Sequence, residues 1–258
     1  MNGDRNMIGT IDLLMVFWRA FFLQASWSFD RMQTVGFAYA IEPVLKKLYT
    51  DPIEYNDRLR LHLEYFNTQP YFASFILGAA VRLEQDRATG RNTTADVSGL
   101  KATLMAPLGA LGDSFFWGSL KPMAAVAAVA VLMTGSWWAP ILFLMLYNAW
   151  HVGLRLGMLF WGFASGGDVA ALMTRYRFTI MAKRFKIVSL SLLGAILGMM
   201  PSWRPEFRPV FNAGLVPALL GLGLTIVLLE FMRRGGSPVK LMLGLAVICL
   251  VLAYAGVV

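Results

Sequence analysis

Two short motifs carry the side chains best suited to bind a ligand. In "EYFNTQPYF", Asn67, Thr68 and Gln69 place three uncharged donor–acceptor groups in a row. In "GDSFFWG", Asp113 lies four residues before Trp117. Uncharged hydrogen-bonding groups beside aromatic faces are suited to hydroxylated solutes such as sugars. We therefore take these five residues as candidate substrate contacts.

Each motif also has a structural explanation that needs no ligand. Asn67 or Thr68 could cap a helix that Pro70 helps to start. Asp113 could cap a half-helix that follows it, where an acid contributes about 1 kcal/mol. An acid at membrane depth is otherwise a functional group by default. Capping and binding are compatible, so both roles stay open.

No catalytic constellation is visible in the sequence. It contains no phosphate-cradling glycine loop, no metal-ligand cluster and no nucleophile–base pair. We expect His62, in the charged stretch "RLHLEYFN", at a helix surface or an interface. His151, in the apolar "YNAWHVGLR", is either packed in a core or lines a cavity. We expect no catalytic residue, no metal and no cofactor.

The composition is that of a membrane protein. Of the 258 residues, 57% are hydrophobic and 15% are charged, against roughly 45–50% and 25% in soluble domains. Residues 123–258 hold 11 Lys and Arg but 3 acids, which accounts for the net charge of +8. Basic residues in short loops between apolar runs are typical of a cytoplasmic membrane face, so we expect no nucleic-acid partner.

Charge-free runs predict the organisation of this second half. We expect an all-α integral membrane protein with a transmembrane region over 123–258. Gly135 and Pro140 interrupt the run 122–154, and each half is short for a crossing, so we predict a broken, re-entrant hairpin there. Three later runs each predict one span: 187–203, 209–229 and 241–258.

The connection 155–186 carries six basic residues and one acid, so we place it in the cytoplasm. Three spans after it put Val258 outside. We expect a multi-pass membrane protein with a cytoplasmic amino terminus.

Residues 1–122 mix apolar and charged residues and predict amphipathic and re-entrant helical hairpins. Arg19 would cost about 2.5–3.5 kcal/mol at mid-bilayer, so the first helix either lies at the interface or packs on a partner. The uncharged stretch 70–81 has re-entrant length, and Gly90 is placed to stop a helix. One apolar stripe at helical spacing defines the first helix: Leu14, Phe17, Trp18, Phe21, Ala25, Phe29 and Met32.

Three long blocks resemble the IID subunit of mannose/fructose/sorbose-type sugar phosphotransferase systems (PTS). They read "VFWRAFFLQASWSFDRMQTVGFAYAIEPVLKKLY", "RLHLEYFNTQPYFASFILGAAVRLEQDRATG" and "LKATLMAPLGALGDSFFWGSLKP". The resemblance covers roughly residues 10–167. The chain departs from the family pattern at Gln69 and Ser114, where the family commonly has histidine and proline, and in a shorter stretch over 201–212.

The resemblance implies a permease subunit in the lipid bilayer that pairs with a IIC subunit, as a trimer of IIC–IID heterodimers, to move a hexose-type sugar. It also implies that IIA and IIB phosphocarriers supply the phosphoryl group, so that the chain itself is not an enzyme. Two alternatives stay open: a IID-like scaffold in a regulatory, non-transporting system, and a membrane enzyme acting on lipid headgroups through Asp113.

Overall fold

The structure is a computed structural model that describes residues 7–91, 96–166, 177–203, 227, 230–231 and 234–254. The chain divides into two units, Met1–Ala195 and Ile196–Val258. The helices that begin in the first unit are α1 Thr10–Ala20, α2 Thr34–Leu48, α3 Pro52–His62, α4 Ala73–Ala88, α5 Val97–Gly112, the π-helix η1 Asp113–Leu120, α6 Lys121–Leu132, α7 Ala139–Ser165 and α9 Phe178–Trp203. In the second unit, α12 spans Pro238–Tyr254.

Helix α4 is the centre of the first unit. Every residue from Phe72 to Val81 is buried, because α2, α5 and α7 pack around this helix. The uncharged stretch 70–81 thus supplies the protein core, and its re-entrant placement in a bilayer stays a prediction. The helix ends at Ala88, and Gly90 follows with a φ of 72°, so the predicted stop is confirmed.

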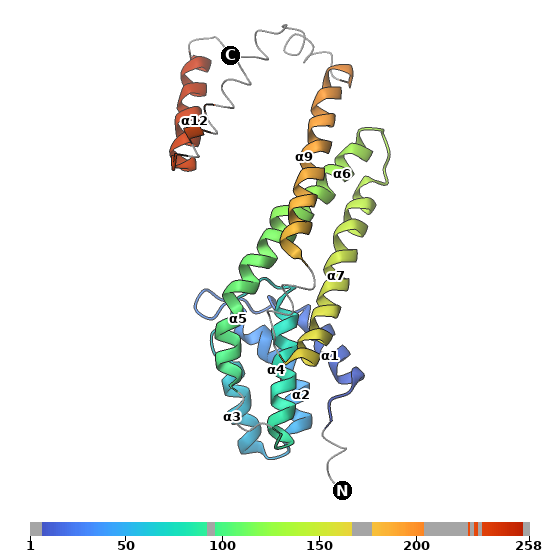
Figure 1. The fold of residues 1–258 in the computed structure, drawn as a ribbon, viewed down its shortest axis with the longest axis vertical. Helices are drawn as coiled ribbons and strands as arrows, with labels where there is room; N and C mark the ends of the chain where they lie inside the picture. The colour runs from blue at the N-terminus through green and yellow to red at the C-terminus, as the bar shows by residue number, and fades with distance from the viewer. Residues whose placement is uncertain are drawn as a thin grey trace. The chain divides into compact units, whose positions relative to one another are not determined.

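Two glycines allow α4 and α7 to pack backbone against backbone. A Cβ atom at Gly78 of α4 would overlap the carbonyl oxygen of Leu159, and one at Gly162 of α7 would overlap that of Phe75. Figure 1 shows the lower end of α7 beside α4. This contact positions α7 against the rest of the unit, since any larger residue at either glycine would separate the helices.

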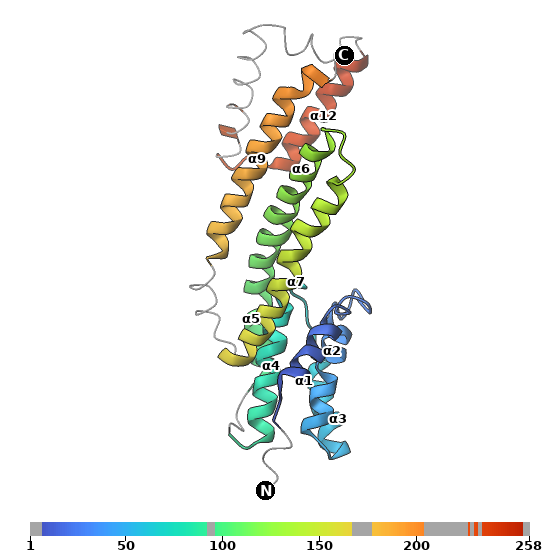
Figure 2. The same cartoon turned by 90° about the vertical axis from the view of Figure 1, so that its right-hand side faces the viewer.

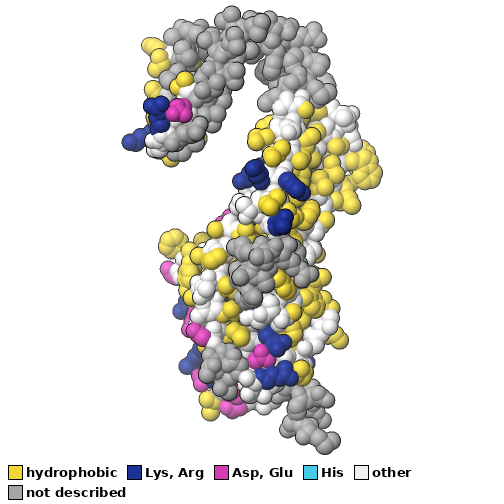
Figure 3. All heavy atoms as spheres, viewed as in Figure 1, with side chains coloured by type: hydrophobic (Ala, Val, Ile, Leu, Met, Phe, Trp, Pro, Cys, Tyr) yellow, Lys and Arg dark blue, Asp and Glu magenta, His cyan; other side chains and the backbone are white. Residues whose placement is uncertain are grey.

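Among the residues that the structure describes, two helices are long and apolar enough to cross a membrane. The first is continuous from Val97 to Leu132 through α5, η1 and α6, and the second is α7. Only 33% and 11% of their most apolar windows are buried, unlike the core helix of a soluble protein. In Figures 1 and 2, α6 and α7 run side by side as an antiparallel pair. Figure 3 shows mainly hydrophobic side chains on the visible face of this pair.

The turn between α6 and α7 lies where Gly135 and Pro140 predicted an interruption. Gly135 has a φ of 80°, and Pro140 occupies the first turn of α7. However, each helix extends well beyond the run 122–154, so helix length no longer favours a re-entrant hairpin. Trp137 and Trp138 are exposed in the turn, as is typical of residues at a membrane interface.

The other predicted boundaries differ from the helix ends because charged residues lie inside helices. The expected domain boundary at 122/123 falls within the continuous helix Val97–Leu132. Of the loop 155–186, the described residues at its two ends belong to α7 and α9. The predicted span 187–203 lies in α9, and α12 contains residues 241–254. Apart from residue 227, the span 209–229 lies outside the described residues, as does most of the segment 201–212.

Helix α1 packs on the rest of the unit through a face other than the predicted apolar stripe. Its buried residues are Leu13, Val16 and Ala20, whereas Leu14 and Trp18 of the predicted stripe are exposed. The helix also ends at Ala20, so the later members of the stripe lie beyond it. The outward apolar face is what either an interfacial helix or a partner-bound helix requires, and both alternatives stay open.

A buried acid joins α4 to α3 and to the end of α2. Glu84 is fully buried and accepts hydrogen bonds from Arg58 (2.7 and 3.0 Å), from the Tyr49 hydroxyl (2.6 Å) and from His62 Nε2 (2.8 Å). Burial alone would raise the pKa of Glu84, but the hydrogen bonds from His62, Arg58 and Tyr49 lower it to about 2.

His62 was wrongly expected at a helix surface or an interface, since its ring is fully buried against Glu84. The charged residues around His62 suggested a solvated helix face, but Arg58 and His62 lie one turn apart on the side of α3 that meets α4. Burial also keeps the pKa of His62 below its usual value, although the hydrogen bond with Glu84 opposes that shift.

Candidate functional site

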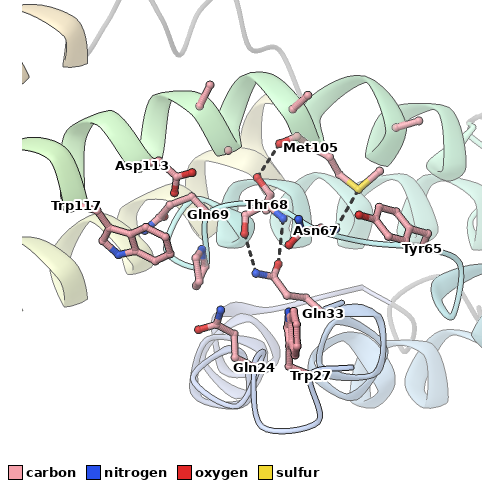
Figure 4. Close-up of a pocket in the computed structure, with 15 residues that line it drawn as sticks. Gln24, Trp27, Gln33, Tyr65, Asn67, Thr68, Gln69, Met105, Asp113 and Trp117 are labelled. Carbon is pink, nitrogen blue, oxygen red and sulfur yellow. Dashed lines mark hydrogen bonds between the residues drawn. The ribbon is translucent and has the colours of Figure 1, made fainter. Parts of the chain in front are cut away.

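A cavity of about 680 Å³ opens between the segment 65–70, the α5–η1 helix and the turn that follows α1. This volume lies within the range of small-molecule sites. Figure 4 shows Asp113 and Trp117 entering from one side and Gln24 and Trp27 from the opposite side. The lining residues are Gln24, Trp27, Gln33, Tyr65, Asn67, Thr68, Gln69, Pro70, Ala102, Met105, Ala106, Gly109, Ala110, Asp113 and Trp117.

All five candidate substrate contacts therefore line one cavity, although Asp113 lies 44 positions after Gln69 in the sequence. The two motifs meet because the segment 65–70 runs along α5. The Thr68 hydroxyl donates to the Met105 carbonyl (2.8 Å), and the Asn67 amide N–H contacts Met105 Sδ at 3.3 Å.

Gln33 fixes this segment from the other side. Its Nε2 donates to the Thr68 carbonyl (2.7 Å), and its Oε1 accepts from the Thr68 amide (3.1 Å). The Gln33 backbone amide donates to the Phe66 carbonyl (2.9 Å). Figure 4 shows how the Gln33 side chain, through these bonds to the Thr68 backbone, links the start of α2 to the cavity wall. Two reciprocal bonds to one residue leave this part of the wall little freedom to move.

Gln69 takes the role that was expected of Asn67 or Thr68 at the start of a helix. The Gln69 Oε1 accepts from the backbone amides of Tyr71 (2.8 Å) and Phe72 (3.1 Å), just before α4 begins. The carbon atoms of its side chain lie so close to Gly112 that a Cβ there would approach to 2.6 Å. The expectation that Asn67 or Thr68 caps this helix was wrong, because the carboxamide two residues upstream of Tyr71 satisfies those amides.

Asp113 lies inside a continuous helix and not at its free end, so its predicted capping role was wrong. It is the first residue of η1 and continues the helical backbone of Gly112. The π-helical turns of η1 end just before Pro122, whose missing N–H is then accommodated without a break. Asp113 is exposed, and its side chain makes no hydrogen bond to any residue that the structure describes. Its carboxylate is therefore free to accept a ligand.

The structure divides the five predicted residues into two groups. Thr68 and Gln69 are buried, and their side-chain oxygens are used within the protein. Asn67, Asp113 and Trp117 are exposed at the cavity, with Trp117 at 49% exposure. The exposed three offer an amide, a carboxylate and an aromatic face. This combination suits a hydroxylated ring with one apolar side.

Sequence reasoning missed the residues that complete the cavity. Gln24 and Trp27 belong to the turn after α1, Gln33 precedes α2, and Tyr65 lies next to the first motif. Tyr65 could have been included, because it belongs to the quoted motif "EYFNTQPYF". The other three lie more than 30 residues from either motif, apart in sequence and together only in the fold.

Comparison with known proteins identifies the family of the chain. Residues 8–258 match the family described as the PTS system mannose/fructose/sorbose family IID component. The mannose-specific EIID component of Escherichia coli (strain K12) is 30% identical over 92% of this chain and 90% of its own length. The fructose permease IID component of Bacillus subtilis (strain 168) is 28% identical over 95% of each chain.

Solved structures give the same result. One, described as the structure of a membrane protein, superposes with a TM-score of 0.73 at 29% identity and covers 96% of this chain and 97% of its own. A chain from the cryo-EM structure of the mannose transporter ManYZ in complex with microcin E492 gives a TM-score of 0.59 at 28% identity, over 97% and 98%.

The apolar helices and these matches define a membrane protein of the sugar permease class. The chain belongs to the IID family of mannose/fructose/sorbose-type phosphotransferase systems.

Proposed function

We propose that this chain pairs with a IIC subunit to form a sugar-translocating unit whose uptake is coupled to phosphorylation by IIB. The cavity is the observation that carries the proposal. It brings Asn67 of the segment 65–70 together with Asp113 and Trp117, which lie on the helix Val97–Leu132 of membrane-crossing length. A hexose is the ligand class that this set of groups suits.

The cavity then forms one wall of the sugar path, and the IIC subunit supplies the other. Hydrogen bonds hold Thr68 and Gln69 in place, so their role is to present Asn67 and the backbone of the segment 65–70. The phosphoryl group arrives through IIA and IIB proteins and is transferred after the sugar has crossed. A trimer of IIC–IID heterodimers is the assembly that we propose.

Reconstituted uptake tests this function. Cells that lack their own hexose permeases would express this chain with its IIC, IIA and IIB partners and receive radiolabelled mannose, fructose or sorbose, the sugars for which its relatives are named. We expect accumulation of a sugar phosphate that is lost when this chain is omitted. A complex that assembles but moves none of the three sugars would instead favour a regulatory scaffold.

We further propose that the chain lies in a bacterial inner membrane, with its membrane region beginning in the helix Val97–Leu132, residues 155–186 facing the cytoplasm and Val258 facing out. The basic residues of 155–186 support this orientation. Single cysteines at Ala164 and Val258, in a chain with Cys249 replaced, would be exposed to a membrane-impermeant maleimide. We expect labelling at 258 in intact cells and at 164 only after lysis; the reverse pattern would refute the orientation.

A further inference from the structure

Arg155 is a cation buried inside an apolar helix. It lies in α7, and its exposure is 3%. Its guanidinium donates from Nη1 to the carbonyl of Ala20 and from Nη2 to the carbonyl of Pro70, both at 3.2 Å. It forms no ion pair with any acid in the part of the chain that the structure describes. The charge is thus held by backbone carbonyls and aromatic rings.

Two aromatic rings enclose this guanidinium. Its Cζ lies 4.6 Å from the ring centroid of Phe21 and 5.2 Å from that of Tyr71, which is the geometry of cation–π contacts. The His151 ring lies 4.0 Å from that of Tyr71, and the hydroxyl groups of Tyr71 and Tyr147 are 2.9 Å apart. Residues 147, 151 and 155 recur every four positions, so one face of α7 contacts Tyr71 at three levels.

These contacts end at the wall of the cavity. Pro70, whose carbonyl accepts from Arg155, lines the cavity itself. Tyr71 follows Pro70, donates its amide to Gln69 and packs edge-on against Phe116 of η1 at 4.7 Å. Arg155 therefore contacts the segment that carries Asn67. Through Tyr71, it is also linked to the helix that carries Asp113.

We propose that Arg155 is a positioning residue for the sugar cavity, which holds the segment 67–71 at its working distance from η1. This inference rests on the proposed transport function. A purely structural role would not require an arginine, because an apolar side chain of similar volume often gives equal or greater stability at a buried position. Only the planar fork of arginine reaches two carbonyls from one fixed position.

The test compares Arg155→Met and Arg155→Lys with Arg82→Met as a matched control. Arg82 lies on α4, pairs with Asp86 at the partly exposed surface and does not line the cavity. Arg155→Met makes α7 more apolar, so membrane insertion of α7 is at least as favourable as before. Uptake over a range of sugar concentrations gives KM and Vmax, and a pull-down through the IIC subunit gives the amount of complex.

We expect Arg155→Met to raise KM about tenfold in complexes of normal abundance, Arg155→Lys to raise it severalfold and Arg82→Met to leave it unchanged. If Arg155→Met does not assemble, Arg155→Lys decides the question. Unchanged KM in an assembled Arg155 variant, or a fall in Vmax that follows only the amount of complex, would overturn the inference. A wild-type complex that moves no sugar would instead overturn the proposed function, and with it this inference.

Discussion

Two acids in the first unit lie in opposite surroundings. Glu84 is fully buried, and three side chains donate hydrogen bonds to its two oxygens. Asp113 lies on an exposed helix face, and its carboxylate accepts no hydrogen bond from any residue that the structure describes. The hydrogen bonds of Glu84 hold three segments of the protein together, whereas the carboxylate of Asp113 can still accept hydrogen bonds from a ligand.

The same contrast exists between two uncharged neighbours. Thr68 is buried and bonded to Met105 and Gln33, while Asn67 is exposed at the cavity. In this pair, the residue whose side chain is bonded within the protein builds the wall, and the residue whose side chain is exposed faces the space that the wall encloses. Changes to the first group should therefore affect stability, and changes to the second should affect uptake.

The largest effect is expected for Glu84→Gln. It leaves the Arg58 charge without its counterion, and removal of one partner of a buried pair costs about 3–5 kcal/mol. We expect loss of assembled complex, or a lower melting temperature by size-exclusion chromatography after heating. Glu54→Gln is the control, because Glu54 is exposed on α3. Equal stability of the two variants would mean that Glu84 does not hold the helices together.

Acid should weaken the complex through the same cluster. The folded pKa of Glu84, about 2, lies below its unfolded value of 4.5, so its stabilisation is present above pH 4.5 and is lost as the pH falls toward 2. When Glu84 is fully ionised, this pKa difference contributes about 3 kcal/mol to the free energy of unfolding. Burial also lowers the pKa of His62. Protonation of the unfolded chain therefore begins to reduce stability as the pH falls below 6.5. Melting temperatures from pH 7 to 4 should fall in the wild type; a flat profile would contradict this account.

Asp113→Asn should affect uptake and spare stability. The amide replaces one acceptor oxygen with a donor and removes the charge, which makes charge-assisted bonds to sugar hydroxyls impossible. We expect uptake to fall at least tenfold, equivalent to about 1.4 kcal/mol, with normal pull-down of the IIC subunit. Asp57→Asn, at an exposed acid on α3, is the control. Normal uptake by the assembled Asp113 variant would remove this residue from the site.

The smallest effects should separate Thr68 from Asn67. Thr68→Val loses the bond to the Met105 carbonyl and should cost about 1 kcal/mol of stability. Asn67→Ala should leave stability within about 0.5 kcal/mol and reduce uptake severalfold. Melting temperature and uptake are measured on both variants. A stability loss at Asn67, or an uptake loss without a stability loss at Thr68, would contradict this division of roles.

Local signals in the sequence predicted several helix ends correctly. The features that were predicted wrongly or missed depend on contacts between residues far apart in the sequence. Gly90 and Gly135 mark real ends of helices because a positive φ is a property of one residue. The boundary predicted at 122/123 follows the charged Lys121, yet the helix runs through both, because an exposed charge does not interrupt backbone hydrogen bonding.

The site was predicted in part for the same reason. Asn67 and Asp113 were found from the composition of their own motifs. Gln33 could not be found, because its importance comes from bonds to Thr68, 35 residues away. His62 was misplaced because its partner Glu84 lies on another helix.

The π-helical segment η1 also records how the long helix could have arisen. A π-turn holds one residue more than an α-turn, so it is the form that a single inserted residue takes when the helix around it is preserved. Deletion of Gly118 would restore ordinary spacing and rotate everything before it by about 100° relative to everything after it. The face of α6 that packs on α7 would then turn away from it, while the residues that line the cavity all precede Gly118 and would keep their places. On this view the antiparallel pair of α6 and α7 owes its alignment to the register of one helix.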